Sequence, residues 1–151
     1  MNIRKATVRD VPAIHALGEH VSEFNVNDQT VTFWPAALLE HAVQSDDVVI
    51  LVAEAEDAIV GFLIINYSKG LKKALIENIY VQPDRRGQGI AHDMLEHMFQ
   101  LLPDMDCEFV STLVRPDAQS AIDLYSRSGF THGETFLWMD ASLSDLFKKR
   151  A

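Results

Sequence analysis

Apolar and polar residues follow two periods along this chain, one typical of strands and the other of helices. Runs rich in β-branched residues predict strands at residues 3–8, 48–55, 58–66, 74–81, 107–114 and 135–139. Apolar residues spaced three and four apart predict helices capped by Asp10 and Asp117, and others around 38–42, 90–102 and 143–147. We therefore expect a mixed α/β (α+β) fold.

Residues in the turns and loops indicate how these elements are connected. Glu56 and Asp57 form an acidic turn between two strands, which predicts an antiparallel hairpin. Residues 74–114 run strand, glycine-rich loop, helix, strand, so the two outer strands of this βαβ unit should be parallel. Gly129 stands where a left-handed helix end is wanted, and Gly133 is expected to turn the chain back into its last strand.

Composition narrows the classes of function. The 151 residues are 48% apolar and 23% charged, which predicts one globular domain over residues 1–151. The net charge of −9 repels a phosphate backbone, so nucleic acid is not an expected partner. The first residues lack the apolar stretch of a secretion signal, no apolar run approaches the length of a membrane span, and Cys107 has no disulfide partner. A cytoplasmic location without a membrane partner is expected.

The loop at residues 86–91 has the features of an anion site. It lies between a strand and the first turn of a helix, where backbone N–H groups have no helical acceptor. Gly87 and Gly89 allow close approach of a phosphate, and Arg85 and Arg86 add positive charge at the rim. The alternative is an ordinary tight turn with solvated arginines. A P-loop is excluded because Ile90 follows Gly89 in place of a lysine.

A dinucleotide fingerprint would need a third glycine where His92 stands. The chain instead resembles the GNAT (Gcn5-related N-acetyltransferase) superfamily. The stretches IRKATVRDVPAI, IENIYVQPDRRGQGIA and SAIDLYSRSGF are similar to its first strand and helix, its pyrophosphate loop and its later helix-to-strand signature. The resemblance implies a central sheet of about six to seven strands flanked by helices, with a splay between the fourth and fifth strands.

The same resemblance implies that acetyl-CoA is the cosubstrate. Its pyrophosphate would lie on the loop, and its pantetheine arm would run beside the fourth strand, where one strand N–H could polarise the thioester carbonyl. The residues expected to bind it are Ile79, Tyr80, Val81, Arg86, Gly87, Gln88, Gly89, Ile90, Ala91 and His92. Ala118 is a departure, because relatives often hold an asparagine there; Asp117 or Gln119 could substitute, and affinity for the cofactor is in question.

Two residues are candidates for acid–base catalysis. Tyr125 occupies the place of a tyrosine that, in many relatives, protonates the departing CoA thiolate; the alternative is a tyrosine that packs against the sheet. Glu77 is the first choice of base, because strand alternation places it in one row with Leu75, Ile79 and Val81. The alternatives are a solvent-facing row or a bulge that shifts the phase.

Other residues give weaker signals. Four histidines lie on polar or mixed helix faces without a paired carboxylate, and no spacing suggests a metal site: His15, His41, His92 and His97. The stretch from Phe24 to Trp34 is either part of an acceptor pocket, with Asp28 receiving a cation, or a hydrophobic plug. Cys107 shows no feature of a nucleophile.

The sequence therefore predicts an acyl-CoA-dependent N-acetyltransferase. An acetyl group would pass from acetyl-CoA to a primary amine by direct attack, and the acidic surface favours a cationic acceptor, either a small molecule or a protein amine. A homodimer is the default expectation for a small enzyme. The alternative function is a non-catalytic acyl-CoA sensor, which the alanine at position 118 keeps open.

Overall fold

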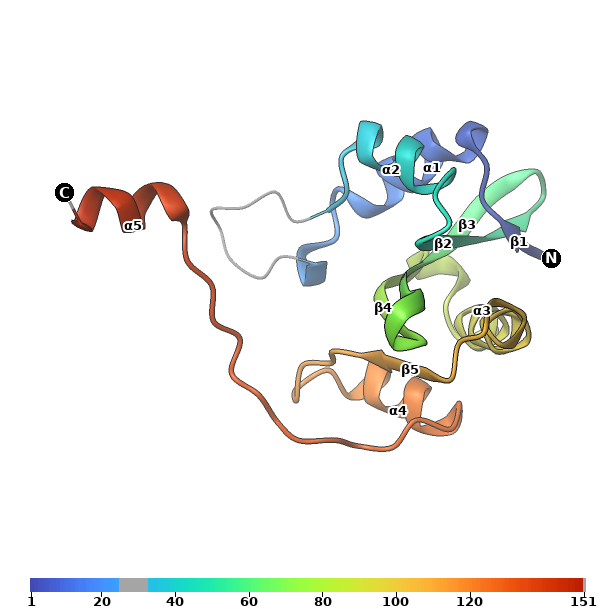
Figure 1. The fold of residues 1–151 in the computed structure, drawn as a ribbon. Helices are drawn as coiled ribbons and strands as arrows, with labels where there is room; N and C mark the ends of the chain where they lie inside the picture. Colours follow the sequence, from blue (N-terminus) through green and yellow to red (C-terminus); the bar gives the residue numbers. More distant parts are fainter. Residues whose placement is uncertain (25–32, 151) are drawn as a thin grey trace.

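The computed structural model describes residues 1–24 and 33–150. In this part of the chain five strands form one sheet in the order β1-β2-β3-β4-β5 (Figure 1). The strands are β1 (Asn2–Lys5), β2 (Val48–Ala55), β3 (Ala58–Ser68), β4 (Lys73–Val81) and β5 (Phe109–Thr112). The helices are α1 (Val11–Gly18), α2 (Ala36–Ala42), α3 (Ile90–Leu101), α4 (Gln119–Arg127) and α5 (Leu143–Arg150). The mixed α/β class is confirmed, with fewer strands than expected.

Helices cover both faces of this sheet. Alternation along β3 directs Phe62 and Ile64 toward α1 and α2, and Leu63 and Ile65 toward α3, and all four side chains are 0% exposed. Each face closes a separate apolar cluster, which explains why β2 and β3 are apolar on both sides. Figure 1 shows α1 and α2 together on one side of the sheet and α3 on the other.

Local backbone chemistry fixes the two connections that were predicted. Glu56 and Asp57 both take left-handed angles, φ 53° and 61°, and join β2 to β3 as an antiparallel hairpin. β4 and β5 pair in parallel on either side of α3, as the βαβ pattern requires. No helix in residues 1–24 and 33–150 is both long and apolar enough to cross a membrane.

Three predictions in the C-terminal part of the chain are wrong. Residues 135–139 form no strand, and Gly133 forms no turn. Asp117 does not cap α4, because Arg115 donates to both of its carboxylate oxygens at 3.1 and 3.0 Å, and the helix begins after Ala118 without a side-chain cap. Gly129, with φ 91°, does end α4 in the left-handed conformation as predicted.

Candidate active site

The two strands β4 and β5 separate part-way along their length. They pair from Lys73 with Phe109 to Ile76 with Thr112, and β5 ends there. β4 continues to Val81 and pairs only with β3 over this distance. The splay that the family resemblance implies is therefore confirmed, and it leaves one edge of β4 open beside the start of α3.

Backbone groups of β4 point into this opening. The Gln82 N–H donates to the Val60 oxygen of β3 at 2.9 Å, which makes these two residues a hydrogen-bonded pair. Because such pairs alternate with non-bonded ones in an antiparallel ladder, Ile79 and Val81 direct their N–H and C=O groups away from β3. Tyr80 does the opposite: its backbone faces β3. The structure therefore brings Ile79 and Val81 to the open edge, and not Tyr80.

The loop before α3 presents a row of unpaired backbone donors. Gly87 and Gly89 have φ of 76° and 84°, and Gly89 is the N-cap of α3. Within the described residues, the N–H groups from Gly87 to His92 have no backbone or side-chain acceptor; the first helical bond runs from Asp93 N to Gly89 O at 2.9 Å. A β-carbon added at either glycine would meet no atom within 4 Å, so the loop is open where an anion would lie.

The two arginines beside the loop have partners of their own. Arg86 donates from Nε to the Val81 oxygen at 2.9 Å, and its guanidinium lies over the Tyr80 ring at 5.7 Å. Arg85 pairs with Glu56 at 3.2 Å and lies 3.9 Å from Asp84. The Arg86 side chain thus connects the loop to the end of β4. The positive charge of Arg85 is largely neutralised by the two acidic side chains beside it. An anion at this loop would therefore be held mainly by backbone N–H groups.

Tyr125 lies on α4 with its hydroxyl beside Thr112, at the point where β4 and β5 part. The side chain is 6% exposed and its ring packs edge-on against Phe130 at 5.1 Å. Burial raises the pKa of the Tyr125 hydroxyl above its ordinary value, and the hydrogen bond with Thr112 opposes this in part. The phenol therefore keeps its proton at neutral pH. Thr112 carried no signal in the sequence, because only the strand pairing places it there.

A β-bulge changes the phase of β4 at Glu77. The register with β3 shifts there, so that Glu77 is an extra residue with no partner. Beyond it, Ile79 and Val81 turn toward the apolar cluster that contains α3. The single row predicted for Leu75, Glu77, Ile79 and Val81 is therefore wrong, and Glu77 is exposed rather than enclosed by apolar neighbours.

The side chains of two asparagines lie beside this bulge, on the face of the sheet that α1 and α2 cover. Asn66 of β3 donates from Nδ2 to a Glu77 oxygen at 2.6 Å, and Asn78 accepts a hydrogen bond from Trp34 Nε1 at 3.0 Å. These contacts join residues 11 and 44 positions apart in the chain. Sequence reasoning missed both asparagines, since neither has a local motif that marks it.

The aromatic residues before α2 form a plug. Phe33 stacks on Phe24 at 5.6 Å and packs on Phe62 at 5.5 Å. Its ring lies directly over Gly18 of α1, where an added β-carbon would come within 2.2 Å of it. The plug interpretation of Phe24 and Phe33 is thus the one the contacts support. Asp28, considered as a cation receptor, lies outside the described residues.

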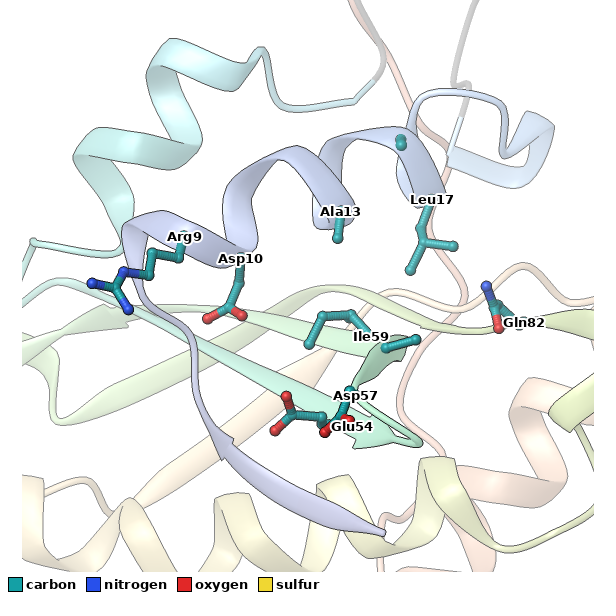
Figure 2. Close-up of a pocket in the computed structure, with 10 residues that line it drawn as sticks. Arg9, Asp10, Ala13, Leu17, Glu54, Asp57, Ile59 and Gln82 are labelled. Atoms are coloured by element: carbon teal, nitrogen blue, oxygen red, sulfur yellow. The ribbon is translucent and has the colours of Figure 1, made fainter.

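A hollow of ≈ 460 Å³ lies elsewhere, between α1 and the tip of the β2–β3 hairpin (Figure 2). Its lining includes Asp10, Glu54 and Asp57, and none of the residues 86–92 or Tyr125 borders it. Asp10 is held in its wall by Arg4, which donates to both carboxylate oxygens at 2.8 and 2.9 Å. The hollow therefore excludes the loop and Tyr125, and it reaches the end of β4 only through Gln82.

Comparison with known proteins identifies the family of this chain. Residues 15–130 match the acetyltransferase (GNAT) family. The chain belongs to the acetyltransferase (GNAT) family. It is 27% identical over 103 residues to the acetyltransferase YE1169 of Yersinia enterocolitica, a match that covers 68% of this chain and 72% of the relative. The chain is accordingly an acyl-CoA-dependent N-acetyltransferase.

Solved structures of other acetyltransferases share the fold. The aminoglycoside acetyltransferase meta-AAC0020 from an uncultured soil metagenomic sample superimposes with a TM-score of 0.77 at 18% identity, covering 94% of this chain and 95% of that one. AAC(6')-Iy, in complex with the bisubstrate analog CoA-S-monomethyl-acetylneamine, gives 0.74 at 17% identity, covering 93% and 97%. At these identities the likeness concerns the fold.

Ala118 stands where the family resemblance implies an asparagine. The two neighbours considered as substitutes, Asp117 and Gln119, are engaged by other side chains. Arg115 holds Asp117, and Gln119 donates to Asp123 at 2.7 Å. His92 at the start of α3 contacts Ser128 at the end of α4 at 3.2 Å, which connects the two helices beside the loop. Asp117 and Gln119 are therefore each held by another side chain at the start of α4.

Proposed function

We propose that this N-acetyltransferase moves an acetyl group from acetyl-CoA directly to a primary amine. The observation that carries the proposal is the continuity of one path. It runs from the free N–H groups of residues 87–92, along the open edge of β4, to the buried hydroxyl of Tyr125. A donor with a pyrophosphate, an extended arm and a reactive thioester fits these three parts in order.

The loop fits the pyrophosphate of this donor. Six unpaired N–H groups, two glycines with open space above them and the N-terminus of a twelve-residue helix supply donors and a partial positive charge. Residues Gly87, Gln88, Gly89, Ile90, Ala91 and His92 would hold it through their backbone. The CoA-containing analog bound by AAC(6')-Iy supports this choice of donor.

The open edge of β4 suits the thioester. The N–H groups of Ile79 and Val81 can align the pantetheine amide and polarise the carbonyl, since a preorganised donor stabilises the negative charge that develops on oxygen. The amine nitrogen then attacks the carbonyl carbon, and the carbon–sulfur bond breaks. Holding both reactants in one geometry supplies much of the rate enhancement. The Cys107 thiol donates a hydrogen bond to the Phe109 backbone oxygen at 3.2 Å and has no role in the proposed transfer.

Two side chains would handle the protons. Tyr125 gives its proton to the departing thiolate, a role that needs a phenol still protonated at neutral pH, and burial raises the pKa of Tyr125 in the required direction. Glu77, directed by Asn66, would take the proton released by the amine, either directly or through a water molecule. Both groups lie next to the splay, since Ile76 precedes Glu77 and pairs with Thr112.

The acceptor is a cationic amine in this proposal. A net charge of −9 attracts cations to the protein, and the exposed carboxylate of Glu77 lies on the side of the sheet that α1 and α2 cover. Two of the structural relatives are described as aminoglycoside acetyltransferases and another as a ribosomal-protein-alanine N-acetyltransferase, so a small polyamine and a protein amine both fit this proposal.

The experiment measures free thiol released from acetyl-CoA with a panel of aminoglycosides, polyamines and lysine-containing peptides. Amine-dependent release supports the enzyme; tight acetyl-CoA binding without release by any amine would favour the sensor. We expect Tyr125→Phe to lower kcat about 100-fold with acetyl-CoA affinity within about threefold of the unmodified protein. Tyr67→Phe is the matched control, because Tyr67 is 7% exposed and its hydroxyl bonds to the Met105 oxygen at 2.6 Å, away from the splay.

The outcome for Tyr125 distinguishes its two interpretations. A tyrosine that only packs would leave kcat unchanged in Tyr125→Phe, and both tyrosine variants would then differ from the unmodified protein in stability alone. A loss of kcat with Tyr125→Phe that Tyr67→Phe does not show supports proton donation.

A further inference from the structure

A groove of ≈ 310 Å³ lies on the sheet over β3, β4 and β5, and the proposed transfer does not use it. Its lining includes Asn66 and Ser68 of β3, Leu75 of β4 and Ser111 of β5. Asn66 pairs with Leu75, and Leu75 pairs with Ser111, so these three side chains share the face of the sheet that α1 and α2 cover. The groove therefore lies on the same face as the Glu77 carboxylate, which Asn66 contacts.

The groove begins where the proposed base stands. Asn66 borders it and donates from Nδ2 to the Glu77 carboxylate at 2.6 Å. Lys73 and Leu75 precede Glu77 on β4, whereas residues 86–92 of the anion loop follow the strand. The groove is therefore on the side of Glu77 that is remote from the anion loop. An acceptor whose amine lies beside Glu77 has room for its remaining atoms there.

The two ends of this region carry opposite charges. Lys73 borders the groove, and its ammonium group makes no ion pair or hydrogen bond within residues 1–24 and 33–150. The Glu77 carboxylate is held by the Asn66 amide and by no cation of the described residues. Lys73 and Glu77 are four residues apart on one strand, so their Cα atoms are roughly 13 Å apart at about 3.3 Å per residue. A ligand with an ammonium group at one end and an anion at the other complements this arrangement.

The basic end of the groove stands out in an acidic protein. Three of the thirteen lysines and arginines occur within residues 69–73, although the net charge of the chain is −9. Lys72 is neutralised by Asp106 and Glu108, whose oxygens lie 3.3 and 3.1 Å from its Nζ. Lys73 has no such partner in the described part of the chain, so its charge is available to a bound anion.

We propose that the acceptor is an amine that carries a carboxylate at the far end of an aliphatic chain, and that Lys73 determines this specificity. The inference rests on the proposed function, because it takes the reacting amine to lie beside Glu77. Lys73 would bind the carboxylate together with the hydroxyls of Ser68 and Ser111, which have no hydrogen-bond partner among the described residues.

The middle of the groove suits an aliphatic chain. Leu75 lies between Lys73 and Glu77 along β4 and borders the groove. Leu71, which is 74% exposed, adds a second apolar side chain to the lining. An aliphatic chain laid over these two leucines removes apolar surface from water, which favours an acceptor with several methylene groups between its two charged ends.

A carboxylate suits the basic end better than a phosphate. Lysine offers a single point charge, whereas phosphate sites commonly use the fork of an arginine or a row of backbone N–H groups. Among the described residues, no arginine borders the groove. A phosphate group also carries about −1.5 to −2 charges, which an acidic protein repels more strongly than a single negative charge.

The first experiment measures thiol release from acetyl-CoA with ε-aminocaproate and with its uncharged primary amide. The acid should have a kcat/KM about tenfold above that of the amide. Lys73→Met should lower kcat/KM for the acid about fivefold to tenfold, through KM rather than kcat, because Lys73 contacts only the remote end of the acceptor. The same variant should leave kcat/KM for the amide within about twofold of the unmodified protein.

Two controls test whether the effect belongs to the groove. Lys5→Met removes an equal charge from β1, at the opposite edge of the sheet from β5, and should change neither acceptor. Glycine is too short to extend from Glu77 to Lys73, so its kcat/KM should not respond to Lys73→Met. Lys73→Glu should reverse the preference and favour cadaverine over ε-aminocaproate. Circular dichroism checks that each variant is folded.

A binding measurement separates this inference from the proposed function. Ligand NMR line broadening in the presence of CoA gives the Kd of the acid and of the amide without turnover. The acid should bind more tightly, and Lys73→Met should remove the difference. Equal Kd values for acid and amide in the unmodified protein, or a preference that survives Lys73→Met, would overturn the inference even if amines release thiol. If no amine releases thiol, the proposed function fails, and the two Kd values still decide whether Lys73 selects a carboxylate.

Discussion

Replacing Gly89 by valine separates the anion site from the stability of the fold. Gly89 is the N-cap of α3 with φ 84° and ψ −1°, and its N–H is one of the six unpaired donors of the loop. A β-carbon there meets no atom within 4 Å. The substitution therefore adds backbone strain without a clash, and it places a branched side chain in the open space where the pyrophosphate would lie.

The strain is modest. An L-residue in the left-handed region costs about 1–2 kcal/mol, and each kcal/mol lowers the Tm of a chain of this size by about 2–4 °C. Gly89→Val should therefore melt about 2–8 °C below the unmodified protein and remain folded at 25 °C. Gly129→Val is the matched control, because Gly129 has φ 91° and equally open surroundings at the end of α4. It should melt lower by a similar amount.

Gly89→Val should weaken the binding of acetyl-CoA much more than Gly129→Val does. A hydrogen bond to a charged group contributes about 1.5–3 kcal/mol, so losing two of those made by the loop weakens binding by at least about 100-fold. Calorimetric titration with acetyl-CoA should show this increase in Kd for Gly89→Val. The Kd of Gly129→Val should stay within about threefold of the unmodified protein.

Equal affinity of the two variants for acetyl-CoA would contradict a pyrophosphate site at this loop. If Gly89→Val binds acetyl-CoA as tightly as Gly129→Val, then the backbone row at residues 87–92 does not hold the pyrophosphate, whatever the effect on Tm. Equal weakening in both variants would also count against it, because strain alone would then account for the loss.

Two further predictions concern the fold. Arg4 lowers the pKa of the buried Asp10 from 3.8 to about 2, so the carboxylate contributes about 2 kcal/mol above pH 4 that is lost as pH falls toward 2. In urea unfolding, Asp10→Asn should therefore be less stable than the unmodified protein at pH 6, with the difference shrinking toward pH 2; a constant difference would contradict the ion pair. Gly18→Ala should lose about 1–3 kcal/mol, because its β-carbon would lie 2.2 Å from the Phe33 ring. Gly70→Ala, with open surroundings, should change stability by less than about 0.5 kcal/mol.

Features that depend on neighbouring residues were predictable from the amino-acid sequence. Strand β2 has the predicted bounds, and the turn at Glu56 and Asp57 and the left-handed Gly129 were predicted from residue type and position. The anion loop was also predictable, because two glycines before an amphipathic helix leave its first N–H groups without acceptors. These features follow from hydrogen bonds and backbone angles within a few residues.

Tertiary structure alone decided the features that join distant parts of the chain. The bulge at Glu77 arises from pairing with β3, and alternation within β4 gave no sign of it. Thr112 reaches Tyr125 only because α4 packs against the end of β5. Residues 135–139 have the composition of a strand and form none, since a strand needs a partner edge as well as a suitable sequence. The packing of the whole molecule decides which strand lies at the edge of the sheet.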